Sequence, residues 1–267
     1  GSGAMDFGRD EVREYTFRLI EEAVQRYDCD GIELDFNRFP NFFKDGSTEE
    51  RVAKMDSLVE RIRTMLNKVA GERGRKLVLA VRVPSNFGRT PPTPETARSL
   101  GCDVVAWVNR GWVDFAAVSE FLLERGDLPI ELWKQSITSV PVYGGIECTK
   151  GSGQKNLTAD EYRAAAKKLL ESGADGIYLF NFFTSREGGV DAYEPPFDVL
   201  RDLVTASSPS LDNLEPDSKS TGLARPDVEF KIFQFPSNQI PRIDGNADDW
   251  SIVPDAYAVG TDQLQET

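Results

Sequence analysis

Apolar and polar residues along positions 10–205 follow patterns that predict helices and strands in turn. Residues 10–27 and 48–70 each carry their apolar side chains on one stripe, at the period of 3.6 residues that an α-helix has. Shorter stretches predict further helices at residues 93–100, 115–124, 159–172 and 198–205. These segments are typical of helices that cover a core on one side.

Five short apolar runs lie between the predicted helices and predict β-strands. The runs cover residues 31–36, 77–83, 104–108, 137–143 and 176–182. Strands that alternate with helices at this spacing predict a parallel sheet with helical crossovers. Two runs begin with the same Asp-Gly-Ile sequence, at residues 30–32 and 175–177, as repeated β/α units would. The predicted fold class is therefore α/β.

Five β/α units are fewer than the eight that close a (β/α)8 TIM-type barrel. Two folds accommodate them: the C-terminal five units of a barrel whose first three units are absent, or an open doubly wound sheet. The two folds differ in strand order, because the strands of a barrel lie in sequential order, whereas the strand order of a doubly wound sheet reverses at a switch point. Self-association of the chain is one way to cover the open edges of such a partial barrel.

The composition changes at both ends of this region, which indicates the domain boundaries. Residues 1–5 have the sequence of a cloning scar, and residues 6–205 form the predicted barrel domain. Residues 206–226 are polar and rich in turn formers, as in a linker. Residues 227–267 include an alternating, strand-like run and predict the start of a β-rich module, too short to complete a sandwich.

Charge and composition exclude several classes of partner and of catalytic site. Lys and Arg total 31 against 44 for Asp and Glu, a formal net charge of -13, which disfavours nucleic acid and anionic membranes as partners. The chain has no histidine, which excludes Ser-His-Asp nucleophiles and His-based zinc sites. Its three cysteines lack metal-like spacing. We therefore predict no metal and no organic cofactor, and expect acid–base chemistry from carboxylates, Tyr or Lys.

The first predicted strand carries two acids on one face. Glu33 and Asp35 alternate with apolar residues that should face the helices, so both carboxylates should point towards the barrel axis. The same alternation turns Arg82 of the next strand inward and makes it the expected ion-pair partner of Glu33, because buried acids need partners. That pair would either support the site or simply fix the barrel. Asp35, one step nearer the rim, is the first catalytic candidate.

The ends of the other predicted strands supply further candidates. They are Trp107, Asn109, Trp112, Asp114, Tyr143, Glu147, Asn181 and Phe182. Aromatic faces beside carboxylates suit sugar rings, although each aromatic residue alone is equally compatible with a place in the core. Glu147 follows two glycines in an expected loop and is the second catalytic candidate, with an exposed, solvated acid as its alternative. Asp114 is the reserve candidate.

Several of these residues lie in segments that resemble a known family. Val12-Arg13 and residues 27–40, with residues 105–107 and 111–114, are similar to the glycosyl-hydrolase-like family 10 barrels of bacterial carbohydrate-utilising proteins. The likeness spans residues 6–205, and in that family this span is the second half of a barrel, which implies three absent units. It also implies a secreted or periplasmic location. Residues 243–250 resemble the opening of a family 9 carbohydrate-binding module.

These observations together predict a glycoside hydrolase that acts on a polysaccharide or oligosaccharide with two carboxylates. Barrels that place acids after their fourth and seventh strands favour Asp35 and Glu147 by analogy. The residues predicted to bind the carbohydrate are Glu33, Arg38, Arg82, Trp107, Trp112, Tyr143 and Asn181. A non-catalytic carbohydrate-binding barrel is the main alternative. An isomerase or aldolase fits less well, because Lys134 and Lys150 fall at no inward strand end.

Overall fold

The computed structural model describes residues 5–38, 40–85, 89–120, 127–149, 156–184 and 194–207. The elements follow in the order α1 (Asp10–Arg26), β1 (Gly31–Asp35), α2 (Thr48–Arg73), β2 (Val78–Arg82), α3 (Pro94–Ser99), α4 (Val104–Asn109), β3 (Phe115–Val118), α5 (Ile130–Ser136), β4 (Val142–Glu147), α6 (Ala159–Glu171), β5 (Gly176–Phe180) and α7 (Val199–Ser207). Residues 206 and 207 close α7. The remainder of the expected linker and β-rich segment lies outside the described residues.

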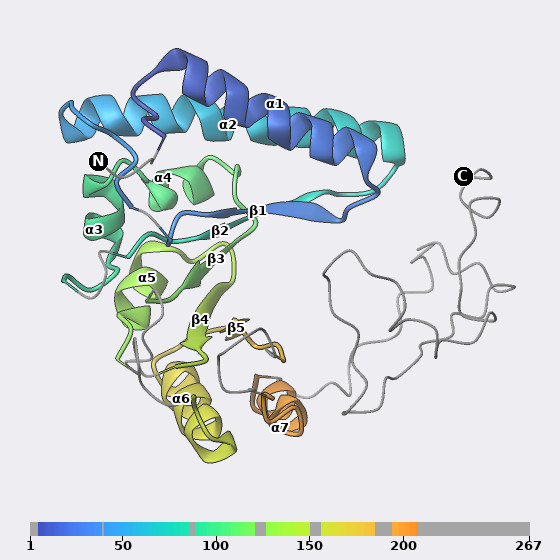
Figure 1. Ribbon diagram of the computed structural model, residues 1–267, viewed down its shortest axis with the longest axis vertical. Coiled ribbons are helices and arrows are strands. Elements are labelled where there is room, and N and C mark those ends of the chain that lie inside the picture. Colours follow the sequence, from blue (N-terminus) through green and yellow to red (C-terminus); the bar gives the residue numbers. More distant parts are fainter. Residues whose placement is uncertain are drawn as a thin grey trace, which may run out of the picture. The chain divides into compact units, whose positions relative to one another are not determined.

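The five strands form one parallel sheet in the order β1-β2-β3-β4-β5. Each strand pairs with its neighbour in the sequence, and the order never reverses. The helices follow the sheet on its outer side, from α1 and α2 beside β1 to α6 and α7 beside β5 (Figure 1). This sequential arrangement is that of an arc of a (β/α)8 barrel and not of a doubly wound sheet, which confirms the predicted fold class.

The outer face of the sheet and α2 form the centre of the core. The outward residues Leu79 and Val81 of β2 are fully buried, as are Val59 and Ile62 of α2. Helix α2 starts at a capping box. The Ser47 side chain accepts a hydrogen bond from the Glu50 backbone N–H, and the Glu50 side chain accepts one from the Ser47 backbone N–H. The predicted helices at residues 10–27, 48–70, 93–100, 159–172 and 198–205 are confirmed within two or three residues.

The middle of the sheet differs from the prediction. Residues 104–108, predicted as a strand, belong to the helix α4, and residues 115–118, predicted to start a helix, form β3. The side chain of Asp103 accepts a hydrogen bond from the Ala106 N–H and caps the helix, while Gly111 adopts a left-handed φ of 71° just after it. This local capping outweighs the strand preference of Val104 and Val105.

The fourth strand begins later than predicted. It runs over Val142–Glu147, whereas the sequence indicated residues 137–143. Ile137 is apolar and fully buried, but its N–H bonds to the carbonyl of Trp133 and ends the short helix α5. The apolar run at residues 137–143 predicts a strand, although its first residue caps the helix α5.

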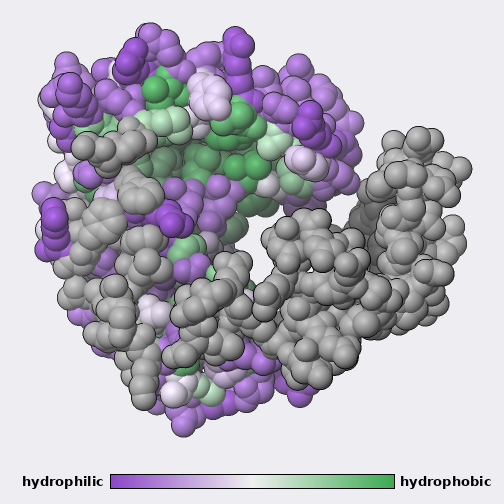
Figure 2. Space-filling view, viewed as in Figure 1, coloured by the Kyte–Doolittle hydropathy of each residue, from purple (hydrophilic) through white to green (hydrophobic). Residues whose placement is uncertain are grey.

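The two ends of the arc carry unpaired strand edges. In the described part of the chain, β1 pairs only with β2, and β5 only with β4. Beside β1, Tyr15 and Leu19 of α1 are 57% and 48% exposed, and hydrophobic residues gather on the surface at this end (Figure 2). The self-association expected from the sequence would involve these edges. No helix among the described residues is long and apolar enough to cross a membrane.

Close packing between β3 and β4 depends on a glycine. A Cβ atom built on Gly145 would lie 2.2 Å from the Cβ of Ser119, in the segment directly after β3. A side chain at position 145 would therefore push apart the two segments that bring their polar residues together at the carboxyl edge.

We predict that Gly145→Ala lowers the free energy of unfolding by about 1–3 kcal/mol, because the added methyl overpacks the sheet. Gly71→Ala in α2 is the matched control, since a Cβ there meets nothing within 4 Å. It should raise stability by up to about 1 kcal/mol through helix propensity. Equal effects of the two changes in urea unfolding would contradict this account of the β3–β4 contact.

Candidate active site on the inner face of the sheet

Polar and aromatic side chains gather on the inner face of the arc. Residues in register on neighbouring parallel strands point to the same face, and Asp35, Arg82, Ala117 and Tyr143 form one such row. Alternation along the strands adds Glu33, Glu147, Tyr178 and Phe180. The inward orientation of Glu33 and Asp35 therefore agrees with the sequence pattern.

Arg82 lies at the centre of this group and is fully buried. Its Nη2 donates to Glu147 Oε1 at 2.5 Å and its Nη1 to Asp35 Oδ2 at 3.3 Å. Its Nε donates to Ser119 Oγ at 2.7 Å, and its guanidinium carbon lies 3.6 Å from the centroid of the Phe180 ring. One side chain thus connects β2 with β1, β4, β5 and the end of β3.

The predicted ion pair between Glu33 and Arg82 is not the one that forms. The register sets Glu33 opposite Ala80, and Arg82 opposite Asp35. The salt bridges of Arg82 consequently go to Asp35 and Glu147. Glu33 instead accepts a hydrogen bond at 2.8 Å from the hydroxyl of Tyr178 on β5. The residues share a face as expected, but the sequence did not reveal the stagger between the strands.

The carboxyl of Glu33 holds its proton more strongly than an ordinary glutamate. Partial burial raises the pKa of Glu33, and the negative charge of Asp35 adds to the rise. The hydrogen bond from Tyr178 and the charge of Arg82 act in the opposite direction but do not outweigh it. Burial, followed by the bond to Glu33, raises the pKa of Tyr178 well above its usual value, so the phenol stays protonated and donates.

Asp35 is an accessible acid, with 37% of its side chain exposed. Its Oδ1 accepts a hydrogen bond from the Asn37 backbone N–H at 2.8 Å, and Arg82 balances its charge through Oδ2. Asp35 is therefore a carboxylate that is oriented by two donors and still open on the inner face.

Asn37 is a structural residue of the site that the sequence analysis missed. It is fully buried, and its Nδ2 donates to the Oγ of Ser119 at 2.9 Å and to the Ser119 carbonyl at 3.1 Å. Its Oδ1 accepts from the Ser85 backbone N–H at 3.3 Å. The amide joins the carboxyl ends of β1, β2 and β3. Its position directly after a strand with inward acids was the available signal.

Glu147 occupies a different environment from the predicted one. It is the last residue of β4, not part of a loop, and only 1% of its side chain is exposed. Its carboxylate faces the guanidinium of Arg82. The alternative of an exposed, solvated acid is therefore wrong.

Asp114, the reserve catalytic candidate, lies at the other end of the sheet. It precedes β3 at the amino edge, where its Oδ2 accepts from the Leu79 N–H at 2.8 Å and from Arg63 at 3.2 Å. Its Oδ1 pairs with Lys76 at 2.5 Å. Asp35 and Glu147 lie at the carboxyl edge, so the structure does not bring Asp114 together with them.

The two tryptophans proposed as sugar platforms belong to the helix layer. Trp107 lies in α4, is fully buried, and donates from Nε1 to Asp56 of α2 at 2.6 Å. Trp112 follows α4, and the guanidinium of Arg110 lies 4.8 Å from its ring. Because the expected strand at residues 104–108 is a helix, neither ring projects from a strand end onto the inner face.

The other predicted binding residues lie in different places along the sheet. Arg38 is exposed just after β1, and Tyr143 is half-buried with its ring 5.1 Å from that of Phe115. Asn181 follows β5 with a left-handed φ of 53°, a conformation that asparagine tolerates better than most residues. Phe182 packs edge-on against Tyr162 of α6, so it belongs to the outer layer.

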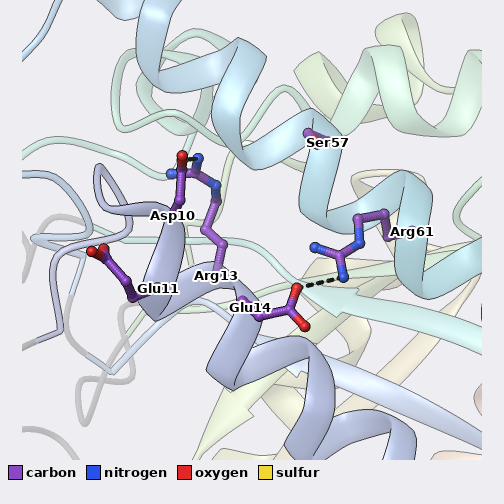
Figure 3. A pocket seen from close by; sticks show the side chains of 6 residues that line it. All are labelled: Asp10, Glu11, Arg13, Glu14, Ser57 and Arg61. Carbon is purple, nitrogen blue, oxygen red and sulfur yellow. Dashed lines mark hydrogen bonds and ion pairs between the residues drawn. The ribbon is translucent and has the colours of Figure 1, made fainter.

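No metal site is evident in the part of the chain that the structure describes. Among those residues, no group of three or more Cys, Asp or Glu side chains could hold a metal ion. A surface pocket of about 500 Å³ lies between α1 and α2 and is lined by Asp10, Glu11, Arg13, Glu14, Ser57 and Arg61 (Figure 3). Most of its charged residues pair with one another, as in the 2.8 Å bond between Arg61 and Glu14. It belongs to the outer helices and not to the inner face.

Comparisons place the chain at a distance from known proteins. No protein-family model matches it, and no curated protein sequence matches it. Similar solved structures include a glycoside hydrolase family 18 N-acetylglucosaminidase from Paenibacillus barengoltzii, with 18% identity and a TM-score of 0.38, over 54% of this chain and 46% of that one.

Two chitinases are also similar. One is a multi-modular cell-surface chitinase from a Paenibacillus species, with 17% identity, a TM-score of 0.34, and coverage of 73% of this chain and 21% of that one. The other is from Bacillus thuringiensis, with 15% identity, a TM-score of 0.33, and coverage of 71% and 28%. The chain spans less than half of each structure. The likeness to glycoside hydrolases is distant, and the fold assignment rests on the strand order.

The environment of Asp114 predicts a role in stability. Burial opposes its charged form, but the bonds from Lys76 and the Leu79 N–H and the charge of Arg63 outweigh burial and lower its pKa. Its stabilising contribution is present above the ordinary Asp pKa near 3.8 and is lost as the pH falls through the lower folded value.

We predict that Asp114→Asn costs about 2–3 kcal/mol in urea unfolding at pH 7, because Arg63 is left buried without its counter-charge. The difference from the wild type should shrink as the pH falls below about 3.8, where the carboxyl of the unfolded chain takes up a proton, and should disappear below the lower pKa of the folded protein. Glu72→Gln, which alters an exposed acid on α2, should change stability by less than about 0.5 kcal/mol. A loss for Asp114→Asn that is the same at pH 7 and pH 3 would contradict the electrostatic explanation.

Proposed function

We propose that the chain carries the active site of a glycoside hydrolase that cleaves O-glycosidic bonds of a polysaccharide or oligosaccharide. The observation that carries this proposal is the contrast between Glu33 and Asp35. The two acids lie on one inner face, two residues apart along β1, roughly 7 Å between Cα atoms. The pKa of Glu33 is raised by burial, whereas the charge of Asp35 is balanced by Arg82. Such a contrast assigns an acid and a base to a pair of carboxyl groups.

Glu33 is the proposed general acid. In glycoside hydrolysis a protonated carboxyl donates its proton to the glycosidic oxygen as the bond to the anomeric carbon breaks. A raised pKa keeps Glu33 protonated at a pH where an ordinary glutamate is ionised. Its position on the accessible inner face lets a sugar approach.

Asp35 is the proposed second carboxylate. Its negative charge would stabilise the positive charge that develops on the sugar ring, either by attack on the anomeric carbon or by activation of a water molecule. The two hydrogen bonds that orient Asp35 leave part of it accessible. Arg38, Tyr143 and Asn181 remain proposed carbohydrate contacts around this pair.

Glu147, predicted from the sequence as the second catalytic acid, has a positioning role in this proposal. Its nearly complete burial and its bond to Arg82 keep it from a substrate on the inner face. It supplies a second negative charge to the guanidinium that also orients Asp35. The catalytic pair proposed from the geometry is therefore Glu33 and Asp35.

We expect Glu33→Gln and Asp35→Asn each to reduce hydrolysis at least about 100-fold, since general acid–base groups typically contribute 100- to 10,000-fold. The assay measures release of reducing ends by the full-length protein on a panel of β-glucans, xylooligosaccharides and chitooligosaccharides. Both amides preserve shape, so glycan binding should change little. Glu33→Gln should also leave unfolding nearly unchanged, whereas Asp35→Asn removes one of the two charges that balance Arg82 and should lower stability.

Glu171→Gln on α6 is the matched control, because it alters an acid that is largely exposed on the outer layer. It should retain wild-type turnover. Full turnover by either inner-face variant would remove that residue from the mechanism. Tight binding of a glycan without cleavage by the wild type would favour the non-catalytic carbohydrate-binding alternative.

A further inference from the structure

The hydrogen bond between Tyr178 and Glu33 joins the two outermost strands of the sheet. β1 and β5 are separated by three other strands, yet the Tyr178 hydroxyl donates to Glu33 Oε1 at 2.8 Å. The sheet therefore curls until inner-face side chains from its two ends meet. Among the described residues, Glu33 is the only acceptor for this hydroxyl.

We propose that Tyr178 is a positioning residue that directs the acid proton of Glu33 to Oε2. This inference rests on the proposed function of Glu33. A protonated carboxyl group has one hydroxyl oxygen and one carbonyl oxygen. Because the Tyr178 O–H points at Oε1, that oxygen is the carbonyl acceptor, and the proton resides on Oε2. Oε2 is then the oxygen that donates to a glycosidic bond and receives the proton back when the site is reset.

The groups around Glu33 keep the Tyr178 hydroxyl as a donor to Oε1. The groups that face it are Asp35 from its own strand, Arg82 from β2 and Tyr178 from β5. Arg82 is a cation whose guanidinium lies 5.8 Å from the Tyr178 ring, so it offers the hydroxyl no acceptor. The phenol has a raised pKa and remains a donor throughout the range in which Glu33 titrates.

Loss of the hydroxyl has a defined electrostatic consequence. The hydrogen bond stabilises the ionised form of Glu33 and so lowers its pKa against the opposing effect of burial. Tyr178→Phe keeps the ring and removes only this bond. The pKa of Glu33 should then rise further, because the ionised carboxylate loses a hydrogen bond that stabilised it.

The test uses the full chain with 13C-labelled glutamate carboxyl groups, with Glu33 assigned from the signal that Glu33→Gln removes. Nuclear magnetic resonance gives the pKa, and infrared spectroscopy gives the carbonyl stretch of protonated Glu33. In Tyr178→Phe we expect the higher pKa and a higher stretching frequency, because the carbonyl oxygen loses its donor. Tyr143→Phe, which removes an inner-face hydroxyl from β4, should alter neither.

The outcomes separate this inference from the proposed function. An unchanged pKa and stretch in Tyr178→Phe, or equal changes in Tyr143→Phe, would overturn the role of Tyr178. If the wild type hydrolyses a glycan, Tyr178→Phe should lower kcat at least tenfold with KM nearly constant, and move the alkaline limb of its pH profile upward. If the spectroscopic changes occur but the wild type cleaves no glycan, the placement of the proton on Oε2 would be supported. Only the proposed glycoside hydrolase function would then be contradicted.

Discussion

The buried positive charge of Arg82 is the constraint on which the inner face depends. A fully buried guanidinium is tolerated only when opposite charges and hydrogen-bond acceptors surround it. Asp35 and Glu147 supply the charges, Ser119 supplies an acceptor, and the face of Phe180 completes the enclosure. Since these partners come from different strands, the electrostatic requirement of one side chain also fixes how the carboxyl ends of the strands meet.

The need to balance the charge of Arg82 gives the acids of the inner face different environments. Glu147 forms an ion pair with Arg82 and is buried from solvent, whereas Asp35 pairs with the same guanidinium and remains partly accessible to solvent. Glu33 lies two residues before Asp35 on β1, outside the salt bridges of Arg82, and burial raises its pKa. The proposed roles of Glu33 as the acid and Asp35 as the carboxylate follow from which of them forms a salt bridge with Arg82.

The alternation of residues around Glu33 and Asp35 was sufficient to predict their strand and their face, because period-2 patterning directly reports which side is apolar. The parallel sheet followed from the alternation of strands with helices along the chain. It could not predict their partners. The offset of two residues that sets Arg82 opposite Asp35 depends on how neighbouring strands are staggered, and that stagger leaves no mark in either strand alone.

Short elements were the other source of error. Val104 and Val105 favour a strand by themselves, but the cap at Asp103 starts a helix, and the true strand at Phe115–Val118 has only four residues. That exchange removed Trp107, Trp112 and Asp114 from the strand ends and hence from the inner face. The hydroxyl of Tyr178 was missed because its partner lies on the far end of the sheet.

A double-mutant cycle on Arg82 and Glu147 tests the central claim most directly. The single variants Arg82→Met and Glu147→Met each leave a buried charge without its partner and should each cost about 3–5 kcal/mol in urea unfolding. Removal of both charges together should cost at least about 2 kcal/mol less than the sum of the two single losses. Strictly additive losses would show that the buried pair is not the interaction around which the inner face is organised.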